Sequence, residues 1–91
     1  QWTVYDISTG ALKNYQVLSL LETVGDNGNR VLWVGTNGGG LSRFENGTWT
    51  TFDTTSGLPS NFVMSLLETV ADDGSKVIWV GTNGGGLARF N

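Results

Sequence analysis

The sequence predicts an all-β fold built from four-stranded antiparallel meanders, and three observations predict it. A segment of 27 residues occurs twice, at positions 18–44 and 64–90, with 20 identical positions. Short runs of β-branched and aromatic residues alternate with Asn-Gly and Asp-Gly pairs, which are strong signals for hairpin turns. The 14 glycines fall mostly at these turns, and the apolar residues do not recur at helical spacing.

The strands of the two copies are expected at corresponding positions. In the first copy the strand-type runs cover residues 17–24, 31–36, 41–44 and 49–53, and in the second copy residues 63–70, 77–82 and 87–90. Residues 2–6 resemble residues 49–53 at an offset of 47, whereas the two long copies are offset by 46. The first copy therefore carries one extra residue between Gly10 and Ser19, and residues 2–6 are predicted to form a fourth strand.

The turns between these strands are predicted to be two-residue turns of type I′. Both central residues of such a turn need a positive φ, which Gly adopts freely and Asn or Asp tolerates. The pairs that carry this prediction are Asn27-Gly28, Asn37-Gly38, Asn46-Gly47, Asp73-Gly74 and Asn83-Gly84.

Several strands are apolar at consecutive positions, which predicts burial on both faces. Residues 31–34 read VLWV, and Leu20 and Leu21 are adjacent. An antiparallel strand with one wet face alternates apolar and polar residues, whereas a strand buried on both faces need not. Each small sheet is therefore expected to lie between two others. Four-stranded meanders packed face to face around an axis form a β-propeller.

The same residues resemble the two-component regulator propeller repeat family. The resemblance is carried by WVGT at 33–36, the glycines at 38–40, LLETV at 66–70 and GLPSN at 57–61. It covers essentially the whole chain as two repeats, and the first copy departs from it at residues 11–14, where the Pro is absent. The resemblance implies seven-bladed extracytoplasmic sensor domains of bacterial signalling proteins. Two copies this similar indicate recent amplification or an engineered chain.

The alignment of the two copies predicts how the chain divides into blades. Residues 2–7 are expected to be a displaced fourth strand, residues 15–53 a complete blade and residues 62–91 a three-stranded second blade. Asn91 aligns with Glu45 and Gln1 with Thr48, so the repeat is interrupted in the turn between the third and fourth strands. An unpaired edge recruits partners. Residues 2–6 of one chain are therefore predicted to pair with residues 87–90 of its neighbour. The expected interface residues are Trp2, Val4, Tyr5, Leu87, Arg89 and Phe90.

The predicted function is structural, with the chain acting as its own partner. Propellers typically have about four to eight blades, and two blades alone leave wide apolar faces exposed. We expect a homo-oligomer that closes a ring through strand exchange between chains. Eight blades from a tetramer are favoured, with a trimer or a pentamer as alternatives.

The composition argues against most other functions. The chain has no Cys and no His, which removes thiol and imidazole chemistry, and repeated positions offer no asymmetric catalytic group. We therefore expect no enzyme activity, no cofactor and no metal. Five basic and eight acidic residues give a net charge of −3, which disfavours nucleic acid. No stretch approaches the roughly 20 apolar residues of a membrane helix, so no membrane association is expected.

A ligand-binding module is the alternative function. The connections between blades and the turns between second and third strands gather at one polar end of the predicted sheets. A sensor-type propeller would recognise a small polar or carbohydrate ligand at this channel mouth. The candidate binding residues are Asn37, Asn83, Asn61, Asn14 and Ser60. On the strands, Glu22 and Glu68 are expected to form ion pairs with Arg43 and Arg89.

Overall fold

The computed structural model describes residues 1–13, 16–25 and 27–90, which form two antiparallel sheets. The first sheet has the strand order β1(Val17–Val24), β2(Arg30–Thr36), β3(Leu41–Glu45) and β4(Thr48–Phe52). The second sheet has the order β5(Val63–Val70), β6(Lys76–Thr82) and β7(Leu87–Phe90), and one 3-10 turn, η1(Thr54–Ser56), lies between the sheets along the chain. The predicted all-β character is confirmed, and each of these strands begins and ends within one residue of its prediction.

The two sheets repeat each other's register. Trp33 in β2 lies opposite Leu21 and Arg43, and Trp79 in β6 lies opposite Leu67 and Arg89. A bulge interrupts the first pairing at the same place in each sheet, between Val17 and Ser19 and between Val63 and Ser65. The two copies are therefore alike in structure as well as in sequence, including the position of the bulge.

The predicted turn type is correct at only one of the five pairs. Asn46 and Gly47 both have a positive φ, of 55° and 81°, as a type I′ turn requires. Among the described residues no other Asn or Asp has a positive φ. At Asp73-Gly74 the side chain of Asp73 instead accepts a hydrogen bond from the backbone N–H of Ser75 at 2.9 Å. This Asx turn stabilises a longer loop, in which Gly74 alone adopts the left-handed conformation.

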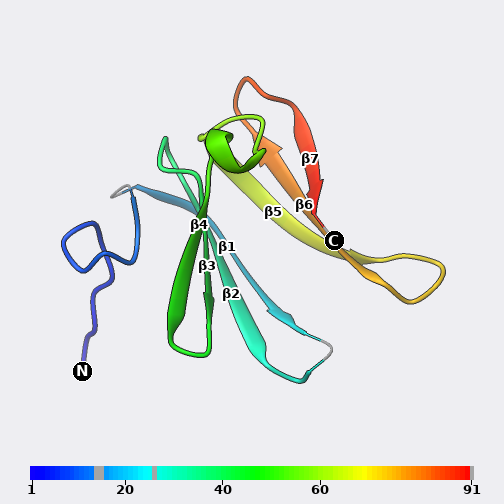
Figure 1. Cartoon of the computed structure of the whole chain (residues 1–91), viewed down its shortest axis with the longest axis horizontal. Coiled ribbons are helices and arrows are strands. Elements are labelled where there is room, and N and C mark those ends of the chain that lie inside the picture. The colour runs from blue at the N-terminus through cyan, green and yellow to red at the C-terminus, as the bar shows by residue number, and fades with distance from the viewer. Residues whose placement is uncertain (14–15, 26, 91) are drawn as a thin grey trace.

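The two sheets approach most closely at one end and fan apart toward the β1–β2 and β5–β6 hairpin tips (Figure 1). Gly35 permits the close approach, because a Cβ at this position would lie 2.6 Å from Cγ1 of the fully buried Val63. A bridge between Asn37 and Phe62 joins the chain segments at the same end.

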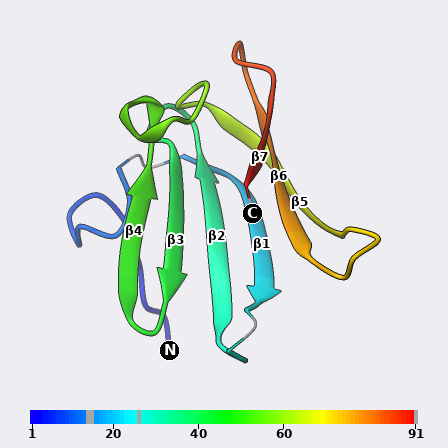
Figure 2. The ribbon, with the colours of Figure 1, turned by 45° about the vertical axis from the view of Figure 1, so that its right-hand side comes forward.

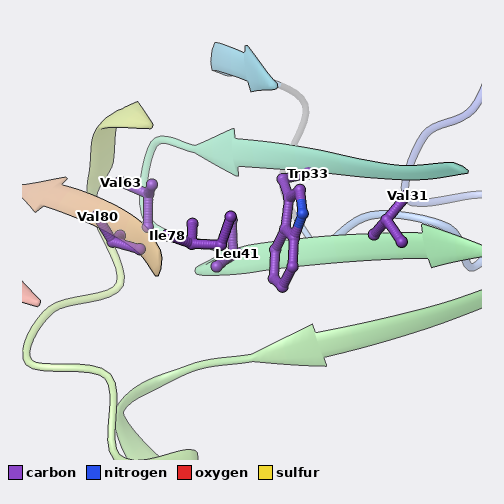
Figure 3. Packing of buried hydrophobic residues seen from close by; sticks show 6 residues of the cluster. All are labelled: Val31, Trp33, Leu41, Val63, Ile78 and Val80. Atoms are coloured by element: carbon purple, nitrogen blue, oxygen red, sulfur yellow. The ribbon is translucent and has the colours of Figure 1, made fainter. Parts of the chain in front are cut away.

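Two apolar clusters lie on opposite faces of the first sheet. The larger one fills the space between the sheets (Figure 3) and consists of Val31, Trp33, Leu41, Val63, Ile78 and Val80. The smaller one lies on what we call the outer face of the first sheet, which carries Leu32 and Val34. There the buried Ala11 and Leu12 of the N-terminal segment pack on Val34. Both faces of β2 are thus covered, as the consecutive apolar residues predicted, although a loop segment and not a sheet covers the outer face. The same prediction is wrong for Leu20 of β1 within the single chain, because this side chain is 64% exposed.

Residues 2–6 form no strand within the single chain. The N-terminal segment lies on the side of the first sheet away from the second sheet (Figures 1 and 2). Trp2 at its start is 95% exposed. The predicted fourth strand of the second sheet therefore has no partner strand among the residues that the structure describes.

Candidate interaction surfaces

The N-terminal segment reproduces the turn that follows β4. Asp6 Oδ1 accepts hydrogen bonds from Ser8 Oγ at 2.6 Å and from the backbone N–H of Thr9 at 3.2 Å. Asp53 Oδ1 accepts from the hydroxyl of Thr55, the counterpart of Ser8, at 2.5 Å, and from the Thr55 backbone N–H at 2.9 Å. Each turn ends at a glycine in the left-handed conformation. Because Asp53 directly follows β4, the residues before Asp6 correspond to β4 in the order of the chain.

These hydrogen bonds favour the ionised carboxylates. The hydroxyl of Ser8 lowers the pKa of Asp6, and the hydroxyl of Thr55 lowers the pKa of Asp53, with backbone N–H groups adding to both effects. The same physical cause acts at both positions, which supports the structural equivalence of the two turns.

The apolar residues after the two turns also correspond. Leu58, five residues after Asp53, packs against the cluster between the sheets, which includes Val80. Ala11 and Leu12 follow Asp6 and pack on Val34, the counterpart of Val80 in the first copy. The outer face of the first sheet thus carries a counterpart of the linker that packs between the two sheets.

Three aromatic rings form the centre of the junction between the sheets. Trp33 and Phe90 meet at 5.5 Å in an edge-on geometry, Trp33 and Phe52 at 6.4 Å, and Phe52 and Phe90 at 5.7 Å. By the repeat offsets, Tyr5 corresponds to Phe52 and Phe44 to Phe90. The rings of Tyr5 and Phe44 lie 6.2 Å apart, so two members of a second such group are in place. The third member would correspond to Trp33.

The second sheet exposes the face that points away from the first sheet. We call this the free face, and it carries Ser65, Leu67, Trp79 and Leu87. Leu67 is 58% exposed and Leu87 is 65% exposed, whereas Leu41, the counterpart of Leu87, is 3% exposed. A hollow of about 540 Å³ on this face is lined mainly by apolar atoms of these residues. An apolar hollow of this kind is typical of a contact surface.

The predicted interface residues fall at two separate places. Leu87, Arg89 and Phe90 belong to β7, whose only partner strand among the described residues is β6. Arg89 lies over the Trp79 ring at 6.0 Å. Trp2 and Val4 are exposed on the N-terminal segment, across the first sheet from β7. The single chain thus contains both halves of the predicted strand pair but does not bring them together.

The described binding residues of the prediction lie at one polar end of the sheets. The side chains of Asn37, Asn61 and Ser60 form hydrogen bonds between loops there. The side-chain amide of Asn37 donates to Gln16, and Asn61 Oδ1 accepts from the backbone N–H of Thr54 at 2.9 Å. Ser60 Oγ donates to the backbone carbonyl of Asn83 at 3.0 Å. Asn14 lies outside the described residues. These contacts join successive loops and give Asn37, Asn61 and Ser60 a structural role, whereas Asn83 takes part through its backbone and is exposed.

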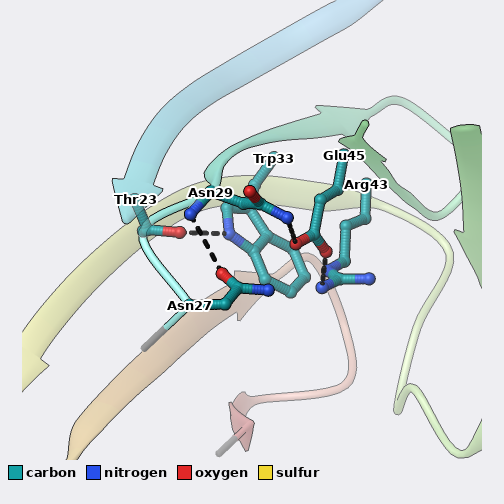
Figure 4. Close-up of polar contacts among 6 residues, drawn as sticks. All are labelled: Thr23, Asn27, Asn29, Trp33, Arg43 and Glu45. Carbon is teal, nitrogen blue, oxygen red and sulfur yellow. Dashed lines mark hydrogen bonds and ion pairs between the residues drawn. The ribbon is translucent and has the colours of Figure 1, made fainter. Parts of the chain in front are cut away.

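A polar group beside Trp33 was not anticipated from the sequence (Figure 4). The indole N–H of Trp33 donates to Thr23 Oγ1 at 3.0 Å, and Arg43 covers the ring at 5.5 Å. Arg43 forms an ion pair with Glu45, which also accepts from the Asn29 amide at 3.3 Å. The sequence signal for this group is the spacing of two between Arg43 and Glu45 on β3, which places both side chains on one face of the sheet.

The predicted ion pairs of Glu22 with Arg43 and of Glu68 with Arg89 are both wrong. Glu22 pairs with Arg30 at 3.0 Å, across the β1–β2 hairpin. Glu22 lies opposite Leu32, whereas Arg43 lies opposite Trp33, so the two side chains point to opposite faces of the sheet. Glu68 lies opposite Ile78, whereas Arg89 lies opposite Trp79, so these two side chains point to opposite faces of the second sheet.

Two general site types are not seen in the described part of the chain. Within residues 1–13, 16–25 and 27–90, no three His, Cys, Asp or Glu side chains converge as metal ligands would. The same residues include no helix with the length and hydrophobicity needed to cross a bilayer.

Comparison with known proteins gives no family assignment. The chain matches no family model, no curated protein and no solved structure. The resemblance to the two-component regulator propeller repeat therefore stays a prediction.

Proposed function

We propose that this chain is a self-assembling β-propeller fragment with a structural role, in which each copy lends residues 2–6 to the sheet of a neighbour. The observation that carries the proposal is the N-terminal segment. It repeats the turn, the linker and one aromatic contact of the connection between the two sheets, but its residues 2–6 pair with no strand among the described residues.

The edge that fits this strand is β7. In the first sheet β3 pairs with β4, with Ser42 opposite Thr51 and Leu41 opposite Phe52. The repeat offsets carry this register over to Ala88 opposite Val4 and Leu87 opposite Tyr5. The second sheet would then have four strands, like the first. An edge strand left open is a template for pairing with another chain.

The exchange is expected between copies rather than within one chain. The first sheet separates the N-terminal segment from β7 in the single chain (Figure 1). When every copy gives its strand to the next, the assembly repeats a single contact and closes as a ring if the rotation permits. A tetramer with eight blades is favoured, with a trimer or a pentamer as alternatives. The resemblance to sensor propellers supports this architecture.

A disulfide tests the register directly, because the chain has no natural Cys. Directly opposite residues of antiparallel strands have Cα atoms roughly 4.5–5.5 Å apart, which suits a disulfide. The variant Val4→Cys with Ala88→Cys should give covalently linked multimers on a non-reducing gel after mild oxidation, and single chains after reduction.

The matched control is Thr3→Cys with Ala88→Cys. It is out of register by one residue, which places the two thiols on opposite faces of the sheet. Cross-linking well above that of the control supports the exchange. Equal cross-linking of both variants, or none in either, would contradict the proposed strand pairing.

The alternative function, recognition of a polar or carbohydrate ligand at the polar end, has less support. The amide of Asn37, Oδ1 of Asn61 and the hydroxyl of Ser60 are all used in contacts between loops. A ligand at these atoms would compete with the contacts that hold the loops together.

A further inference from the structure

We infer that the free face of the second sheet docks on the outer face of the first sheet of a second copy, repeating the junction seen within one chain. This inference rests on the proposed function and extends it. Strand exchange requires only an edge, whereas the inference assigns the two sheet faces that meet and the orientation in which they meet.

The junction within the chain shows which side chains pack together when two such sheets meet. The face of the first sheet that carries Leu21, Trp33 and Leu41 packs against Leu66, Ile78 and Val80 of the second sheet. One repeat further along the chain, the counterparts of the first set are Leu67, Trp79 and Leu87, which form the free face. One repeat beyond the second sheet is the first sheet of the next copy. The counterparts of the second set are therefore Leu20, Leu32 and Val34, which lie on the outer face.

Both shifted faces retain exposed apolar area in the single chain. Leu20 on the outer face is 64% exposed, and Leu67 and Leu87 on the free face are exposed as well. Of the residues compared, only Leu32 differs from its counterpart, Ile78, and these side chains have similar volumes. The free face and the outer face have nearly the same side chains as the two faces that pack together within one chain. They should therefore pack together in the same way between chains.

The aromatic group at the junction gives the most specific part of the fit. Tyr5 and Phe44 are already in contact on the outer face, and the ring that would complete the group corresponds to Trp33. That ring is Trp79 of a second copy. Trp79 is half-buried on its own free face, beside the apolar hollow, with its indole N–H bonded to Thr69 at 2.7 Å. Its indole N–H already has a partner, so docking would leave no unpaired donor on this ring.

The two faces are different, which fixes the direction of assembly. A two-fold dimer would place like faces together and would leave one face of each chain bare. Head-to-tail docking covers both faces of every copy once the ring closes. Charged substitutions on either face should therefore act on assembly without disturbing the junction inside the chain.

The test compares the native mass of Leu67→Glu with that of Val70→Glu. Both residues are exposed apolar residues of β5, at 58% and 64%, and an odd spacing of three places them on opposite faces. Only Leu67 lies on the free face. An unpaired carboxylate there should weaken association by about tenfold or more. Val70→Glu should keep the oligomer mass, and circular dichroism should show that both variants retain the β structure.

The outcomes separate this inference from strand exchange. If Leu67→Glu keeps the oligomer mass while the Val4–Ala88 disulfide still forms, strand exchange stands and face docking is overturned. If Leu67→Glu dissociates the oligomer and the disulfide does not form, face docking stands and strand exchange is overturned. Dissociation of both glutamate variants, or a single-chain mass for the unmodified protein, would also overturn face docking.

Discussion

At the scale of single residues, Ser42 shows how the two copies differ in energy. Ser42 is buried on the outer face, and its hydroxyl has no hydrogen-bond partner among the described residues. The counterpart in the second copy is Ala88, which packs against the cluster between the sheets without a polar group. A buried hydroxyl without a partner is unfavourable, so the second copy has the better residue for this site.

We therefore predict that Ser42→Ala raises the free energy of unfolding by about 1 kcal/mol. Urea unfolding followed by tryptophan fluorescence measures the change. Thr23→Val is the control, because it removes a hydroxyl that does have a partner, the indole N–H of Trp33. That control should lower the free energy of unfolding by about 1–3 kcal/mol. A loss of stability in Ser42→Ala would contradict the assignment of an unpaired hydroxyl.

At the scale of elements, the two Asp turns decide how the chain leaves one sheet and enters the next. Asp53 caps η1, accepting from Thr55, and the Ser56 hydroxyl in turn accepts from the backbone N–H of Asp53 at 3.3 Å. Asp6 makes the corresponding turn in the N-terminal segment. Both carboxylates have a lowered pKa in the folded chain.

The pKa shift of Asp53 predicts a dependence of stability on pH. Because the pKa is lower in the folded chain than the unfolded value of about 3.9, the ionised turn stabilises the fold fully above that value. The contribution is lost as the pH falls through the folded pKa. The difference in Tm between the unmodified chain and Asp53→Ala should be constant near neutral pH and should shrink below pH ~4. A difference that persists unchanged into strong acid would contradict this role.

The elements were largely predictable from the sequence, and the contacts between them were not. The runs around Trp33 and Trp79, with their flanking glycines, define strands by local chemistry alone. The Asn and Asp pairs predict that a turn exists, but not its length, because side-chain bonds such as that of Asp73 compete with the type I′ geometry. The partner of Arg43 depends on which face of the sheet it occupies, and the register decides that.

The candidate site was predictable only in part, for a related reason. The alignment placed Val4 and Ala88 on strands that match a complete blade, which defines the edge. It did not show that Tyr5 contacts Phe44 on the outer face, or that Asn37 and Asn61 are bound in loop contacts. Such contacts depend on the closeness of segments far apart in the sequence, which only the folded chain supplies.

At the scale of the whole molecule, the described chain is a wedge of two sheets with one apolar cluster between them and apolar residues on both far faces. The repeat of the sequence relates the far faces of this wedge to its inner faces. Three features of the inner junction have a counterpart on the far faces, namely the turn of Asp6, the linker at Leu12 and the aromatic pair of Tyr5 and Phe44. A ring of such wedges would give every face the partner that it has inside the chain.

The native mass of the folded protein tests this account most directly. We predict the mass of several chains, with four favoured, and a fall to a single chain when residues 1–7 are deleted, because the β7 edge then has no strand to pair with. Native mass spectrometry on both proteins, with circular dichroism to show that each is folded, measures this. A single-chain mass for the folded full chain, or an unchanged oligomer after the deletion, would contradict assembly by strand exchange.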